Sequence, residues 1–353
     1  MWSQLRTYCA AAVALAALAA LAAATGPAGT TEDDRRAVWR AAYRPPSVIP
    51  FPETNPYSPA KADLGRRLFF DPILSGNNDR ACVSCHRPDL AWSDGRARAS
   101  TLVGGDMDLR TPTLLNVAWQ DGPLGWDGKF HSLELVARAP ITGIGNMNST
   151  IPDAVKRVSA DDSYREAFAA AFGDPVVSAE RLDAALATFQ RLIVAGEAPF
   201  DRWISGDETA IPDAAKRGFD LFNGRAGCAS CHSGWSFTDN SFHDIGTATG
   251  SDIGRGRFMP NSVALRYAFK TPTLREVGKR APFMHDGSIP TLEAVIDLYD
   301  KGGIERPSRS RQIKPLNLTA EEKADLLAFL GTLTADGDRD ETSAVFPPQA
   351  PTP

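Results

Sequence analysis

Two stretches of the sequence decide the fold: LGRRLFFDPILSGNNDRACVSCH, from Leu64 to His86, and AAKRGFDLFNGRAGCASCH, from Ala214 to His232. Each leads from a predicted helix into the motif C-x-x-C-H. Two more blocks recur downstream in the same order: RTPTLLNVA (110–118) with KTPTLREVG (270–278), and WDGKFHSLELV (126–136) with HDGSIPTLEAV (285–295). Repeated blocks in one conserved order predict a tandem duplication.

The C-x-x-C-H motif carries the groups that attach a c-type haem. Two thiols bond the two vinyl groups, and the adjacent histidine reaches the iron, all within one turn of the chain. A zinc ion joining the two pairs is the alternative, although zinc-binding pairs usually lie closer together in sequence. The repeat therefore predicts two covalently bound haems, attached through Cys82, Cys85 and His86 in the first copy and Cys228, Cys231 and His232 in the second.

The N-terminus has the pattern of an export signal. Arg6 precedes a run of mostly Ala, Leu and Val from Tyr8 to Ala24, which ends in an A-x-A cleavage pattern. We expect residues 1–24 to be removed as a signal peptide and the mature protein to be periplasmic; an uncleaved membrane anchor is the alternative. The fifth cysteine, Cys9, lies within this leader.

Each copy is predicted to be mainly helical. Helix starts are expected at Ser58, at Ser178 and after Pro212, and Thr319 has a glutamate three residues on, the spacing of a capping box. No stretch alternates as a strand. The net charge is −5 and the basic residues are scattered, so no nucleic-acid partner is expected. We expect the junction between the copies at Ile204–Ile211.

The blocks LGRRLFFDP, CVSCH, TPTLLN, WDG, SLE, CASCH, TPTLR and HDG occur in this order between about Pro59 and Leu333. Through these blocks and their order, the chain resembles the bacterial di-haem cytochrome c peroxidases and MauG. The resemblance implies an all-α fold of two tandem cytochrome c-like haem domains with long loops. The expected ranges are an extension at 25–56, a peroxide-reactive N-terminal haem domain at 57–205, an electron-transfer C-terminal haem domain at 206–335 and a flexible tail at 336–353.

The resemblance also predicts unlike coordination of the two irons. Where a family member fills the sixth coordination position of the N-terminal haem iron, it uses a histidine soon after C-x-x-C-H. This sequence has no histidine between His86 and His131, so we expect that iron to be open. In the family the C-terminal haem takes a ligand fourteen residues after the histidine of the HDG block, which here is Tyr299. Two methionines are the alternatives, Met284 and Met259.

Four residues are expected at the peroxide-reactive side by the same resemblance. Trp126 matches a tryptophan between the haems, and Pro140 matches a proline over the open haem. Asn146 stands where the family has an acid–base glutamate, and an amide has no proton that titrates near neutral pH. The expected substitutes are His131, a water held by Asn146, or Glu134 after a shift of register.

Arg110 departs from the family pattern in another way. It stands where the family has an asparagine that helps to hold calcium between the domains. A fixed positive charge disfavours a cation beside it, so calcium is expected to be absent or weakly bound. Neighbouring carbonyls and water are the alternative ligands.

These features together predict an oxidoreductase that reduces hydrogen peroxide at the N-terminal haem. Electrons would pass through the C-terminal haem from a small periplasmic cytochrome or copper protein. MauG-like oxidation of a specific protein residue is the first alternative, and Tyr299 favours it. A non-enzymatic electron carrier and a redox sensor are the others, and the missing glutamate favours the carrier. A second copy of the chain, forming a homodimer, is a further candidate partner.

Overall fold

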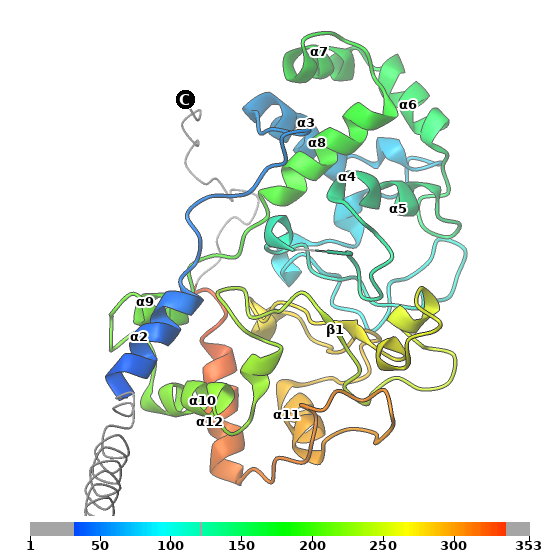
Figure 1. Ribbon diagram of the computed structural model, residues 1–353. Coiled ribbons are helices and arrows are strands. Elements are labelled where there is room, and N and C mark those ends of the chain that lie inside the picture. Colours follow the sequence, from blue (N-terminus) through cyan, green and yellow to red (C-terminus); the bar gives the residue numbers. More distant parts are fainter. Residues whose placement is uncertain (1–31, 121, 337–353) are drawn as a thin grey trace, which may run out of the picture. The chain divides into compact units, whose positions relative to one another are not determined.

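The computed structural model describes residues 32–120 and 122–336. The expected signal peptide and nearly all of the expected tail lie outside these residues. The chain divides into two units, residues 1–42 and 43–353. The described residues of the first unit belong to α2 (Glu32–Tyr43), whose last residue is counted with the second unit. The elements that hold the motifs belong to the second unit (Figure 1). Within the described ranges, no helix has the length and apolar character needed to cross a membrane.

The first copy is built on two helices that lie side by side, α3 and α8 (Figure 1). The Ser58 side chain accepts the Lys61 N–H at 3.2 Å, so α3 begins where the sequence predicts. Ser178 caps α8 in the same way. The helices of this copy are α3 (Pro59–Phe70), α4 (Leu133–Val136), α5 (Arg138–Thr142), α6 (Ile151–Ala160), α7 (Asp162–Phe172) and α8 (Ala179–Arg191).

The second copy repeats this arrangement with α10 and α12. The α10 helix begins directly after Pro212, as expected. The predicted capping box is formed at α12: Thr319 Oγ1 accepts the Glu322 N–H at 3.2 Å, and Glu322 Oε2 accepts the Thr319 N–H at 2.8 Å. The helices are α10 (Asp213–Asn223), α11 (Leu292–Lys301) and α12 (Ala320–Gly331).

A glycine allows each helix pair to approach closely. A Cβ atom added at Gly65 would lie 2.0 Å from the carbonyl oxygen of Ala185 on α8. A Cβ atom added at Gly218 would lie 2.0 Å from the carbonyl oxygen of Asp325 on α12. Both distances are far below contact, so only glycine fits at either position. The two copies therefore share a packing detail as well as a motif.

The short helix α9 (Pro199–Ile204) packs with the second copy. The Phe200 ring centroid lies 5.4 Å from that of Phe219 and 5.7 Å from that of Phe329, both in the second copy. Trp203 lies 5.3 Å from Phe219. These contacts join α9 to the second copy, and the expected junction at Ile204–Ile211 stays a prediction.

The loops of the second copy contain one strand pair that the sequence did not predict. Strands β1 (Phe242–His243) and β2 (Phe269–Lys270) are antiparallel, and His243 lies opposite Phe269. Two residues a strand are too few to give an alternating pattern. The pair matters because it places His243 beside the second motif.

Candidate functional site

Both C-x-x-C-H motifs form the same turn. The first three residues of each make a 3-10 turn, Cys82–Ser84 in one and Cys228–Ser230 in the other. The backbone N–H of His86 donates to the Cys82 carbonyl at 3.0 Å, and that of His232 donates to the Cys228 carbonyl at 2.9 Å. One tight turn therefore brings both thiols and the imidazole to one place, as attachment of a c-type haem requires.

A backbone carbonyl orients each imidazole. Nδ1 of His86 lies 3.1 Å from the Trp92 oxygen, and Nδ1 of His232 lies 2.9 Å from the Phe237 oxygen. Because a carbonyl only accepts, each Nδ1 must carry the proton, which leaves Nε2 as the ligand atom. Burial lowers the pKa of both histidines, so both rings are neutral, the form that binds a metal.

The cysteines do not have the properties of a redox dithiol or a zinc site. All four are free thiols, and burial raises the pKa of Cys82 and of Cys228 to about 12. The reactive thiols of redox dithiols have lowered pKa values. Among the described residues, one group of metal-binding type occurs, formed by Cys231, Asp239 and His243, so the two pairs do not meet. The zinc alternative is therefore not supported.

The second motif opens into a largely apolar cavity. Cys228, Cys231 and His232 line it on one element, and Tyr299 lines it from α11. Burial, and then the two cysteines, raises the pKa of Tyr299 above its usual value. Met284 also lines this cavity, whereas Met259 is 44% exposed and does not line it. The structure thus brings Tyr299 and one of its two rivals to the second motif.

Trp126 joins the two copies. Its indole Nε1 donates to the Arg110 carbonyl at 3.2 Å, and its own carbonyl accepts the Lys270 N–H at 2.8 Å. Although Trp126 belongs to the first copy, it lines the cavity of the second motif. A place for Trp126 between the two haems, as the resemblance implies, stays a prediction.

The other residues expected at the peroxide-reactive side are placed unequally. Pro140, in α5, and Asn146, in the turn after it, are half-buried, and the Pro140 carbonyl accepts the N–H of the residue after Asn146 at 3.1 Å. His131 is exposed, which favours an ordinary surface role. Glu134 accepts from Arg191 at 2.7 Å and from Asn55 at 3.1 Å, so its carboxylate is already engaged.

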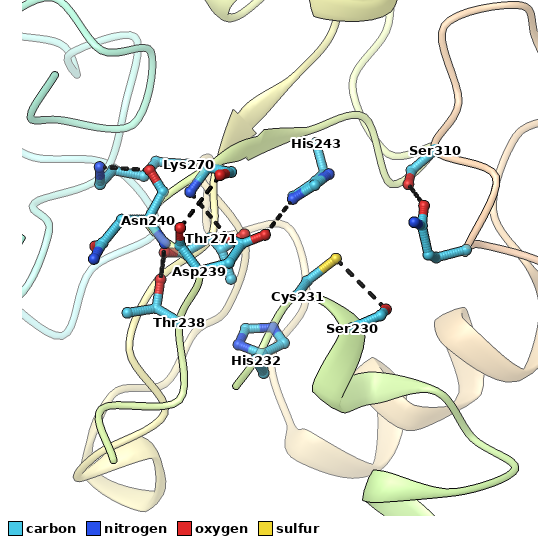
Figure 2. A network of polar contacts seen from close by, with 12 residues as sticks. Ser230, Cys231, His232, Thr238, Asp239, Asn240, His243, Lys270, Thr271 and Ser310 are labelled. Carbon is cyan, nitrogen blue, oxygen red and sulfur yellow. Dashed lines mark hydrogen bonds and ion pairs between the residues drawn. The ribbon is translucent and has the colours of Figure 1, made fainter. Parts of the chain in front are cut away.

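Sequence reasoning missed an acid–base pair beside the second motif. His243 Nε2 lies 2.7 Å from a carboxylate oxygen of Asp239, and both face Cys231 (Figure 2). Asp239, and then Cys231, raises the pKa of His243 to about 10. The four-residue spacing of DNSFH is the one signal that could have suggested the pair, and it is weak without the β1–β2 pairing that fixes the turn.

Two buried arginines complete the cavity wall, Arg110 from the first copy and Arg280 from the second. They are 6% and 8% exposed, and the Nε atom of each is buried without a hydrogen-bond partner. An apolar cavity with orphaned cationic donors, two thiols and an oriented imidazole fits an iron porphyrin that carries carboxylate groups. The residues present therefore suit a haem at the second motif.

The fold and the two motifs define a di-haem c-type cytochrome. The family model described as di-haem cytochrome c peroxidase matches residues 59–209, and the cytochrome c model matches residues 215–334. The chain is 49% identical to the methylamine utilization protein MauG of Methylorubrum extorquens, over 93% of this chain and 92% of that protein. It is 35% identical to the cytochrome-c peroxidase IdrP1 of a Pseudomonas species, over 81% and 84%.

A solved structure gives the same result. The chain resembles a MauG-like protein associated with microbial copper homeostasis with a TM-score of 0.77 and 32% identity, over 86% of this chain and 97% of that one. The chain belongs to the di-haem cytochrome c peroxidase and MauG family. It is a haem oxidoreductase of that family with two c-type haems, and its fold is the predicted pair of tandem cytochrome c-like domains.

Proposed function

We propose that this protein is a periplasmic enzyme that consumes hydrogen peroxide at an open haem on Cys82, Cys85 and His86. The observation that carries the proposal is that the described part of the first copy has no partly or fully buried histidine besides His86 that could bind the iron. The sequence has five histidines, and the first copy contains two, His86 and the exposed His131. An iron with one protein ligand keeps a position for peroxide, whereas a filled one suits electron transfer.

The second haem is proposed to be held by Cys228, Cys231 and His232, with Tyr299 as its other ligand. Tyr299 lines the same cavity as the motif, and its raised pKa describes the neutral phenol before iron binds. A bound cation favours the phenolate, as metals do for other acidic ligands. Such an anionic ligand stabilises the ferric state, so this haem would accept oxidising equivalents readily.

We propose that the oxidising equivalents are spent on a residue of a protein substrate. The haem supplies the redox chemistry: peroxide takes up two electrons and two protons and leaves as two waters. The substrate residue loses two electrons and two protons. The 49% and 44% identities to proteins named MauG, against 35% to one named peroxidase, favour this over a small cytochrome or copper protein as electron donor. Methylamine utilization is the process that those relatives suggest.

The proton chemistry at the first haem is proposed to use an ordered water. Asn146 cannot supply a proton near neutral pH, but its amide can hold a water by hydrogen bonds. The alternatives have less support, because His131 is exposed and Glu134 is bound by Arg191 and Asn55. A hydrogen bond from the residue after Asn146 to the Pro140 carbonyl keeps the two residues close, so together they would shape the side on which peroxide binds.

The experiment that tests this function offers the enzyme two reductants. Peroxide is added with a reduced small cytochrome, or with a protein encoded beside this chain, and each is followed separately. We expect the protein substrate to lose two hydrogen masses for each peroxide consumed and the cytochrome to be oxidised slowly. Fast oxidation of the cytochrome, with no change in the protein, would make the chain a conventional peroxidase.

A further inference from the structure

Arg110 and Arg280 form a cationic pair that no carboxylate of the described chain balances. Both line the cavity of the second motif, and neither forms an ion pair with a described residue. Asp94 acts on Arg110, and Glu276 on Arg280, only as more distant charges. Both arginines are more than nine-tenths buried. Two positive charges therefore face one cavity with their neutralising partners missing.

The hydrogen bonds of the pair leave donors unused. Both terminal nitrogens of Arg110 donate to the Arg280 carbonyl, each at 3.1 Å. Arg280 donates one terminal nitrogen to the Thr273 carbonyl. The Nε atom of each remains buried and unpaired. A guanidinium has five N–H groups in a fixed fork that suits a carboxylate, so each arginine retains donors for one.

A third buried arginine, Arg275, differs from this pair because it has a carboxylate partner. Arg275 is 2% exposed and binds both carboxylate oxygens of Asp201, at 2.7 and 2.8 Å. Arg275 does not line the cavity. By contrast, burial, and then the charge of Arg110, lowers the pKa of Arg280 to about 9. The chain thus pairs a structural arginine but leaves the two cavity arginines without a carboxylate.

We propose that Arg110 and Arg280 bind the two propionates of the C-terminal haem. The inference rests on the proposed attachment of that haem at Cys228 and Cys231. The thioether bonds hold the vinyl edge of the porphyrin, and its two propionates extend from another edge as carboxylates. Two carboxylates in the cavity would balance the two guanidiniums and fill their unused donors. Since Arg110 belongs to the first copy, the haem of the second copy would be bound by both.

This arrangement predicts how the two arginines act on the C-terminal haem. Positive charge close to the porphyrin favours the reduced iron, which carries one charge fewer than the oxidised iron. Removing one guanidinium should therefore favour the ferric state. We expect the equilibrium constant for reduction of the C-terminal haem to fall at least tenfold in R110Q and in R280Q, which is 59 mV for one electron.

The experiment uses the full di-haem protein and charge-matched variants. R110K and R280K keep the charge, R110Q and R280Q remove it, and R165Q removes an exposed, ion-paired arginine of α7 as a control. Spectroelectrochemistry gives the potential of each haem, and resonance Raman spectra report the propionate bending bands. We expect the Gln variants to lower the C-terminal potential. The Lys variants should change the equilibrium constant for reduction of the C-terminal haem by less than about threefold, but they should shift the propionate bands. R165Q should change neither the potential nor the bands.

The failures are distinguishable. Unchanged potential and unchanged bands in all four cavity variants would overturn the propionate site while leaving the proposed function intact. If a Gln variant does not fold, the Raman bands of its Lys counterpart decide, and unshifted bands count against the proposal. A haem missing from the peptide that contains Cys228 and Cys231, found by mass spectrometry of the unaltered protein, would instead overturn the proposed function.

Discussion

Tyr299 reaches the cavity of the second motif from the last turn of α11, near the end of that helix at Lys301. The family resemblance pointed to this tyrosine, fourteen residues after His285, and the structure places His285 in the lining of the same cavity. The structure does not decide between Tyr299 and Met284 as the ligand of the second iron, because both side chains line the cavity. That choice depends on iron chemistry.

Replacing Tyr299 by Phe tests the ligand directly. The variant removes the phenolate, so we expect the spectrum of the low-spin haem to change and its reduction potential to rise. Optical and paramagnetic resonance spectra of the ferric protein measure this, and M284L is the matched control that should leave both unchanged. A Y299F spectrum identical to that of the unaltered protein would remove Tyr299 from the coordination sphere.

Replacing Asn146 by Glu restores a titratable group in the turn after α5. General acid–base catalysis is worth two or more orders of magnitude, so we expect the rate of the peroxide reaction to rise by about 100-fold. Stopped-flow absorbance measures the rate, with H131A as the control, which should have no effect because His131 is exposed. An H131A variant that loses the reaction would identify His131 as the proton donor.

At the scale of elements, local sequence predicted the helix starts but not their partners. Ser58, Ser178 and Thr319 cap the helices that they were expected to cap, because capping depends on residues three positions apart. The association of α9 with the second copy and the β1–β2 pair depend on contacts across long stretches of chain. No local pattern encodes such contacts.

The glycine contact between α10 and α12 makes a prediction about stability. Helix propensity alone favours Ala over Gly by about 1 kcal/mol. At Gly218 the added methyl would overlap the Asp325 carbonyl, so we expect G218A to destabilise the protein by about 3 kcal/mol. Chemical unfolding followed by circular dichroism measures the change. Gly331, also in α12, has no atom within 4 Å of an added Cβ, so G331A should be neutral or slightly stabilising. Equal effects of the two substitutions would refute the close contact.

At the scale of the whole molecule, the repeat predicted two haem domains of one fold, and the family match confirms them. The repeat could not predict how Arg110 and Trp126 of the first copy contribute to the cavity of the second. This arrangement follows from contacts between the copies, such as the 3.0 Å hydrogen bond from the Arg110 N–H to the His285 carbonyl. It is also the part of the molecule where the chain departs from the family pattern at Arg110.

Calcium removal tests that departure. The Arg110 guanidinium is buried and donates to the Arg280 carbonyl, so a cation beside it is electrostatically unfavourable. We therefore expect treatment with a calcium chelator to leave the haem spectra and the peroxide reaction unchanged. Metal analysis of the purified protein provides a second measurement. Loss of activity on chelation, restored by added calcium, would contradict this expectation.

Adding peroxide to the ferric di-haem protein, without any electron donor, tests whether an open haem in the first copy consumes peroxide. Haem absorbance and residual peroxide are recorded together. We expect a rapid change in the haem bands and the loss of one peroxide per chain. Unchanged bands with all of the peroxide recovered, in a protein shown to carry both haems, would contradict that expectation.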